Sequence, residues 1–196
     1  VTGEAPVTGG EATATLSLDA PDLWWPNGLG AQALHELIVT LGTETATRRI
    51  GLRDLRLLTT PDATGARFAL SVNGREVFCK GANWIPADAL AGRISREGVR
   101  DLLQSARDAN MNMIRIWGGG RYEPDWFYDL CDEMGLMVWQ DFMFACHLYP
   151  ATDDFLAELE REVHGQGAGL ADHACMGLCC GNKDMLGGLP RFEERR

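Results

Sequence analysis

The chain has 196 residues, of which 45% are hydrophobic and 23% charged, the balance of a globular protein with one full domain or two small ones. Its net charge of −10 and pI near 4.8 exclude binding to nucleic-acid backbones, which requires clustered Lys and Arg, and favour a neutral or cationic ligand. No apolar run approaches the roughly 20 residues that a membrane-spanning helix needs, and residues 1–12 lack the features of a signal peptide.

Six cysteines lie in apolar stretches rather than in pairs across short loops, which predicts reduced thiols and a cytoplasmic location. A zinc-binding module is one alternative, because four potential ligands are close in sequence: His173, Cys175, Cys179 and Cys180. Structural zinc sites usually have a second, distant ligand pair, and the sequence contains none. Buried cysteine acting as a small hydrophobe is therefore favoured, and we expect no metal and no cofactor.

The first part of the chain has a period of two. Apolar residues alternate over 12–18, at Leu37, Val39 and Leu41, and at Leu55 and Leu57. A turn is expected at Pro26-Asn27-Gly28 between them. The pattern predicts short antiparallel strands of a β-sandwich, with further strands expected upstream of residue 1.

A hairpin is predicted next. Apolar residues alternate at Phe68, Leu70 and Val72, up to Asn73-Gly74, which is the strongest short-range hairpin signal. Residues 75–79 are expected to form the second strand of the hairpin.

After Lys80 strands alternate with helices. Residues 77–86 predict a buried strand, and Ser95 is expected to cap a helix that Asn110 ends. Further strands are predicted at 111–117, 136–142 and 175–182. Helices are predicted between them, one opened by Pro124 at a first-turn position and closed by Gly135, and one along residues 155–163. This order predicts parallel strands joined by helical crossovers.

Each of the four predicted parallel strands ends in polar or aromatic residues. A lone Trp is more often core, and a lone Asp usually caps a helix, but four such ends favour one site at the mouth of a (β/α)8 barrel. They are Asn83 and Trp84, Arg115 and Trp117, Gln140 and Asp141, and Asn182, Lys183 and Asp184.

The segment Trp117-Gly118-Gly119-Gly120 suggests the ligand class. Its glycines lack the spacing of known phosphate-binding loops, so a phosphate ligand is disfavoured. A flat indole beside guanidinium and carboxylate groups suits a sugar, whose C–H face stacks while its hydroxyls need donors and acceptors.

Most of the chain from Leu23 onward resembles the β-mannosidases of glycoside hydrolase family 2. The segments that carry the resemblance are LWWPNGLGAQ, RRIGLRDL, SVNGREVFCKGANWIPAD, NMNMIRIWGGGRYEPDWFYDLCDEMGLMVWQDFMFAC and DHACMGLCCGNKDML. The resemblance implies that residues 1–58 are the C-terminal part of an immunoglobulin-like β-sandwich, and that 59–196 are the first four βα units of a TIM (β/α)8 barrel. A sugar-binding domain and the other half of the barrel are expected outside this chain.

The family implies a retaining exo-glycosidase that removes terminal β-D-mannose with two glutamates, whose carboxyl groups lie about 5 Å apart. Its acid/base glutamate ends the fourth strand in a W-C-G-N-N-E or W-C-G-D-N-E pattern, which places Asp184 in the general acid/base position. The nucleophile glutamate is expected on a strand that this chain does not reach, so the chain is expected to be inactive alone. The resemblance implies that Trp117, Arg115, Lys183, Asn182, Asp141 and Trp84 bind a β-mannoside substrate.

Three substitutions distinguish this chain from the family pattern. Asp184 is one methylene shorter than Glu, which withdraws the proton by roughly 1 Å and can cost about 10²-fold in rate. Lys183 stands where the family has an asparagine, and its ammonium would lower the pKa of Asp184. Cys179 replaces a tryptophan. A sugar-binding pseudoenzyme is therefore an alternative. Another exo-acting member of the same family, such as an exo-β-glucosaminidase, is a further alternative, because its barrel begins similarly.

Overall fold

A computed structural model of the chain describes residues 1–147 and 149–181. It contains three β-sheets and a set of helices, which makes the chain a mixed α/β structure. Within those residues, no helix combines the length and apolar character needed to cross a membrane.

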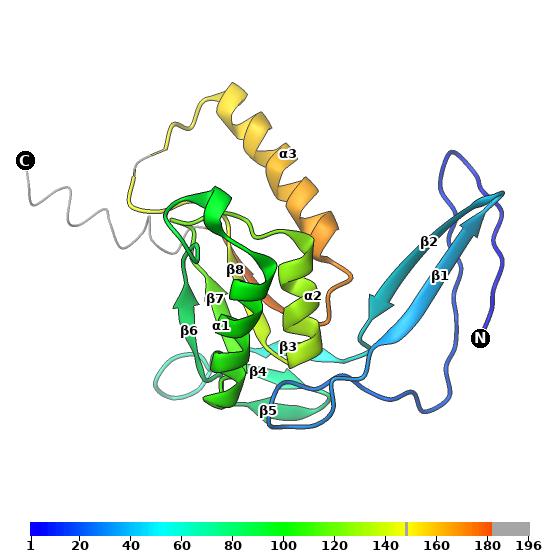
Figure 1. Cartoon of the computed structure of the whole chain (residues 1–196), viewed down its shortest axis with the longest axis horizontal. Coiled ribbons are helices and arrows are strands. Elements are labelled where there is room, and N and C mark those ends of the chain that lie inside the picture. Colours follow the sequence, from blue (N-terminus) through cyan, green and yellow to red (C-terminus); the bar gives the residue numbers. More distant parts are fainter. Residues whose placement is uncertain (148, 182–196) are drawn as a thin grey trace, which may run out of the picture.

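The first sheet is an antiparallel hairpin of β1 (His35–Leu41) and β2 (Glu44–Ile50). Leu41 pairs with Glu44, so the turn has two residues, and Gly42 takes the positive φ of 59° that such a tight turn needs. The hairpin projects away from the rest of the molecule (Figure 1). The strand expected from the alternation at Leu37, Val39 and Leu41 is thus confirmed.

The strand expected over residues 12–18 is wrong. These residues form no strand, and the β-type pairing of residues 1–22 is an isolated bridge between Thr8 and Glu11. Period-two alternation shows that a segment could line a sheet, but a strand also needs a neighbour for its N–H and C=O groups. No described strand is paired with this segment.

The second sheet is antiparallel and consists of β3 (Leu55–Leu58), β4 (Ala69–Val72) and β5 (Arg75–Val77). Asn73 and Gly74 have φ values of 50° and 78°, as a type I′ turn requires, so the predicted hairpin is confirmed. Because β3 pairs with β4, this sheet spans the boundary expected between residues 58 and 59. It lies at the end of the third sheet where β6 begins (Figure 1).

The third sheet has four parallel strands in chain order: β6 (Gly81–Trp84), β7 (Met113–Ile116), β8 (Met137–Asp141) and β9 (Met176–Cys180). Between them come η1 (Ala91–Arg93), α1 (Arg96–Asp108), α2 (Asp125–Met134) and α3 (Asp153–Leu170). The prediction of parallel strands with helical crossovers is confirmed.

The predicted helix ends are largely confirmed. The Ser95 hydroxyl accepts from the Gly98 amide at 3.1 Å, and Asn110 follows the end of α1 with a φ of 61°. Gly135 ends α2 in the left-handed region, with a φ of 72°. Pro124 is the N-cap of α2, one position before the expected first turn.

Helices α1 and α2 cover one face of the parallel sheet (Figure 1). Their buried side chains form the core with the strands and with a residue from the N-terminal part. The largest fully buried members are Trp24, Val99, Leu103, Ile116, Phe127, Tyr128, Leu130, Leu136, Met137 and Val138.

The WWPNG segment anchors the N-terminal part of the chain to this core. Trp24 is fully buried, and its indole N–H donates to the Asp132 carbonyl at 2.8 Å. The Asn27 side chain donates to the carbonyls of Arg107 and Met111, at 3.0 and 2.9 Å, where α1 ends. The turn predicted at residues 26–28 therefore has a docking role, because it satisfies carbonyls that the helix leaves unpaired.

The expectation that β6 is buried is wrong. Gly81, Ala82 and Asn83 are exposed, because β6 is an edge strand whose one neighbour in the sheet is β7. Gly81 nevertheless has no room for a side chain, since a Cβ there would lie 1.8 Å from the Met113 carbonyl oxygen.

Helix α3 extends away from the sheet (Figure 1), and of its residues only Leu170 is buried. Gly165, Gly167 and Gly169 are helical, and a Cβ at each would have no atom within 4 Å. Glycine thus costs helix stability here without any packing reason.

Replacing Gly165, Gly167 and Gly169 by Ala should stabilise α3 by roughly 1 kcal/mol per site, because alanine lowers the backbone entropy of the unfolded chain. Amide hydrogen exchange along α3 should slow accordingly. Gly81→Ala is the matched control and should destabilise the chain, because its methyl meets backbone. Unchanged exchange in the triple variant would contradict the expectation.

Candidate active site

The parallel sheet has two chemically different faces. Successive residues of a strand point to opposite faces, so Asn83, Arg115 and Asp141 share the face that α1 and α2 leave uncovered. Trp84, Ile116 and Gln140 share the face that packs on α2. Among the described residues predicted at the ends of β6, β7 and β8, Asn83, Arg115 and Asp141 therefore point toward a candidate site, whereas Trp84 and Gln140 point toward the core.

Arg115 lies at the centre of the uncovered face. Its guanidinium forms a bidentate ion pair with Asp141, with Nε at 3.3 Å from Oδ1 and Nη2 bonded to Oδ2. Nη1 donates to the Asn83 side-chain oxygen at 3.3 Å. The Arg115 and Asp141 side chains are only 10% and 6% exposed, so little water screens the pair. The ends of β6, β7 and β8 are held together by these bonds.

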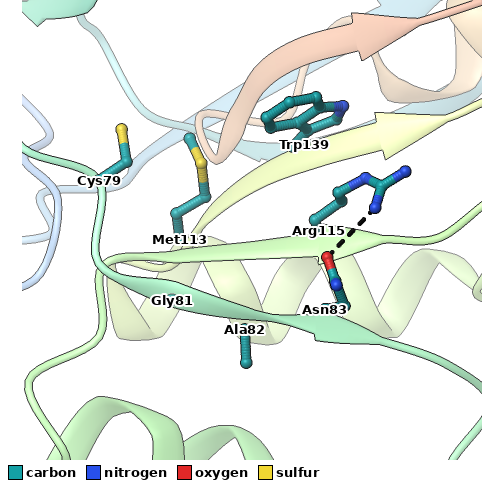
Figure 2. Close-up of a pocket in the computed structure, with 7 residues that line it drawn as sticks. All are labelled: Cys79, Gly81, Ala82, Asn83, Met113, Arg115 and Trp139. Atoms are coloured by element: carbon teal, nitrogen blue, oxygen red, sulfur yellow. Dashed lines mark hydrogen bonds between the residues drawn. The ribbon is translucent and has the colours of Figure 1, made fainter. Parts of the chain in front are cut away.

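Trp139 lies beside Arg115 on the same face. The Arg115 guanidinium carbon is 5.5 Å from the centre of the Trp139 ring, within cation–π range. Figure 2 shows both side chains lining a groove of about 350 Å³ with Cys79, Gly81, Ala82, Asn83 and Met113. The sequence prediction missed Trp139, although its spacing of two from Asp141 was a signal that they share a face.

The three glycines after β7 allow loops to approach closely. A Cβ on Gly118 would lie 2.4 Å from the Phe142 carbonyl oxygen, and one on Gly120 would lie 3.0 Å from the Pro86 ring. The Gly118 amide also donates to Asp141 Oδ2 at 3.3 Å. The glycines thus join the loops that follow β6, β7 and β8, which explains the WGGG pattern without a phosphate.

Trp117 lies within this loop and is half-buried. A Cβ on Gly119 would lie 2.2 Å from the Trp117 ring, so the indole packs directly on the glycine loop. One ring face is therefore covered by the protein's own backbone.

Trp84 is not brought together with Arg115. Its ring contacts Phe127 of α2 with centroids 5.1 Å apart, and its indole N–H donates to Glu123 Oε1 at 3.1 Å. Glu123 is buried and also pairs with Arg121 at 3.3 Å. Glu123 was not among the predicted residues, and its carboxylate links the loop after β7 to the end of β6.

Asn182, Lys183 and Asp184 lie outside the described residues. The chain reaches them from the end of β9, where Cys180 pairs with Asp141 and its carbonyl accepts from the Phe142 amide at 2.9 Å. The last described residue, Gly181, thus follows a strand end adjacent to Asp141.

The four residues of the zinc alternative do not form one cluster. His173 and Cys175 precede β9, whereas Cys179 and Cys180 lie at its other end, roughly 13 Å along the strand at 3.3 Å per residue. A different trio, Asp132, His173 and Cys175, places its ligand atoms within 4.8 Å of one another.

Hydrogen bonds among the members of this trio account for its geometry. Asp132 accepts from the Cys175 amide at 2.6 Å and contacts His173 Nδ1 at 2.7 Å. Burial raises the pKa of the Cys175 thiol well above its ordinary value, which opposes the thiolate that a metal requires. The trio therefore acts as a structural link between α2 and β9.

Comparison with known proteins finds relatives that are named β-mannosidase. No family model matches it. It is 42% identical over 170 residues to "Beta-mannosidase" of Capra hircus, a match that covers 83% of this chain and 19% of that protein. It is 40% identical over 190 residues to "Beta-mannosidase B" of Thermothelomyces thermophilus, covering 93% of this chain and 22% of that protein. The chain is β-mannosidase-like over most of its length.

Solved structures agree with this resemblance. The crystal structure of β-D-mannosidase from Dictyoglomus thermophilum matches with a TM-score of 0.81 and 44% identity, over 85% of this chain and 21% of that one. The exo-chitosanase CsxA of Amycolatopsis orientalis matches with a TM-score of 0.70 at 24% identity, which shows similarity of fold alone. The β-mannosidase-like chain spans about a fifth of the length of the curated relatives it matches.

Removing one partner of the Arg115–Asp141 pair should strongly destabilise the chain. We expect Asp141→Asn to cost about 3–5 kcal/mol, because it removes the charge of a carboxylate that forms a buried ion pair with the Arg115 guanidinium. The double variant Arg115→Met/Asp141→Leu should cost less than Asp141→Asn, since both charges are gone. Urea unfolding measures the two values, and equal losses would contradict this account.

His173 should make stability depend on pH. Burial alone would lower the pKa of His173, but the hydrogen bond and charge of Asp132 outweigh it and raise the pKa above 6.5. The protonated form is thus favoured by folding, so its stabilisation is fully present below pH 6.5 and lost as pH rises through the raised pKa. Thermal melts should show this loss in the wild type but not in His173→Gln.

The control for this measurement is His164→Gln, which removes an exposed histidine 3.9 Å from Glu160. It should keep the pH dependence of the wild type. The same loss of stability with rising pH in His173→Gln would refute the role of His173.

Proposed function

We propose that this chain is part of a β-mannosidase, a retaining exo-glycosidase that hydrolyses terminal β-D-mannose. The observation that carries the proposal is the identity of about 40% with proteins named β-mannosidase across most of the chain. The uncovered face of the sheet supports it, because Arg115, Asn83 and Trp139 place charged, amide and aromatic groups in one groove, where Arg115 is bonded to Asp141.

We further propose the finer architecture that the family implies. Residues 1–58 would be the C-terminal part of an immunoglobulin-like β-sandwich, and 59–196 the first four βα units of a (β/α)8 barrel. The order of β6 to β9 in the sheet follows the chain, as consecutive strands of such a barrel do. Further barrel strands would cover the face that carries Arg115, and would border the exposed edge of β6.

In the proposed reaction Asp184 donates a proton to the glycosidic oxygen while the bond from that oxygen to the anomeric carbon breaks. A glutamate on a later strand, outside this chain, bonds to the anomeric carbon. Water then displaces the glutamate and returns a proton to Asp184. Trp117, Arg115, Asp141, Asn182, Lys183 and Trp84 were expected to bind the sugar, and of these we assign Trp84 to the core behind the site.

A sugar-binding pseudoenzyme is the second candidate function. The observation that favours it is the pair Lys183 and Asp184, where the family pattern has Asn and Glu. In that case Arg115 and Asp141 would still bind mannose, and hydrolysis would be lost.

The full-length protein that contains this chain should release p-nitrophenol from p-nitrophenyl β-D-mannoside faster than from the β-D-glucosaminide. Asp184→Glu should raise kcat by up to about 10²-fold, because it returns the proton to its expected place. Asp184→Asn should abolish turnover of poorly activated mannosides. Faster release from the glucosaminide would favour the exo-β-glucosaminidase, and calorimetric mannose binding without hydrolysis would favour the pseudoenzyme.

A cytoplasmic location is also proposed, since the six cysteines are free thiols in the described residues.

A further inference from the structure

Two successive buried hydrogen bonds lie directly behind the candidate site. The Tyr128 hydroxyl of α2 donates to Gln140 Oε1 at 2.7 Å, and Gln140 Nε2 donates to the Asp141 carbonyl at 2.8 Å. Tyr128 is 1% exposed and Gln140 is fully buried. Both side chains lie on the helix-covered face, whereas the Asp141 carboxylate points to the opposite face.

The donor and acceptor groups of Tyr128 and Gln140 fix the direction of these hydrogen bonds. A tyrosine hydroxyl that donates to the amide oxygen of Gln140 turns the amide nitrogen toward Asp141, where it serves as a donor. Burial raises the pKa of Tyr128, so its hydroxyl stays protonated and keeps its donor role. The ring is held in place by Phe127 and His173, with centroids 5.6 and 5.5 Å away.

Asp141 connects these two hydrogen bonds to the candidate site. Asp141 is the last residue of β8, and the peptide that follows it is held from β9 by the Phe142 amide, which donates to the Cys180 carbonyl at 2.9 Å. Its carboxylate bonds to Arg115 and to the Gly118 amide. A rotation of the Asp141 peptide would therefore move the guanidinium and the glycine loop together.

We propose that Tyr128 and Gln140 are positioning residues that fix the main chain at Asp141 and thereby orient Arg115 and the WGGG loop. Neither residue touches the groove, so they act through Asp141 alone. Their effect on turnover rests on the proposed function, but their effect on Asp141 does not.

The test uses Tyr128→Phe, Gln140→Leu and the double variant, in this chain and in the full-length protein. Each single variant leaves a buried polar group without a partner, whereas the double variant replaces both by apolar groups and should recover thermal stability. Tyr122→Phe is the matched control, because it removes a hydroxyl that bonds to Glu162 on α3.

The readout that does not need activity is hydrogen exchange of the Gly118 amide, which bonds to Asp141. We expect exchange to speed up about tenfold in both single variants and to stay fast in the double variant, although its melting temperature recovers. Tyr122→Phe should leave it unchanged. Wild-type exchange at Gly118 in Gln140→Leu, or its recovery together with stability in the double variant, would overturn the proposal.

The second readout is hydrolysis of p-nitrophenyl β-D-mannoside by the full-length protein. We expect kcat/KM to fall about tenfold in all three variants and to stay unchanged in Tyr122→Phe. Recovery of kcat/KM along with stability in the double variant would show a merely structural role. If the wild type does not hydrolyse the mannoside, the proposed function fails, and the Gly118 exchange decides the positioning role by itself.

Discussion

The ion pair between Arg115 and Asp141 is the interaction on which the candidate site depends. It joins neighbouring parallel strands at their carboxyl ends, and it also engages Asn83 from β6 and the Gly118 amide from the loop after β7. A buried ion pair of this kind is costly unless its remaining hydrogen-bonding groups are satisfied. The surrounding amides meet that requirement, so the site is held as one unit across three strands.

The reverse face of the sheet supports this unit. Trp84 and Gln140 occupy strand positions adjacent to site residues but bond to Glu123 and to Tyr128. The ends of β6 and β8 therefore each carry one side chain toward the site and one that ties the same backbone to α2 or to the loop before it. Substitutions in the helix-covered core are therefore expected to change the geometry of the site through these hydrogen bonds.

The strongest sequence signals concerned local structure. The Asn73-Gly74 turn, the Ser95 cap and the left-handed Gly135 each depend on a few adjacent residues, and the structure confirms all three. The expectations that were wrong depended on which strands pair with one another. Residues 12–18 have the alternation of a strand but no described strand to pair with, and β6 has apolar residues but lies at an edge.

The sequence by itself determined the alternation of strands and helices, the strand ends as the place for polar residues, and the likeness to β-mannosidases. The tertiary structure alone decided which of those residues share a face: it joined Arg115 to Asp141 and Trp139, and turned Trp84 away into the core. The physical reason is that periodicity fixes the face of a side chain within one strand, whereas contacts between strands depend on register. Register is set by pairing and packing of segments that are distant in sequence.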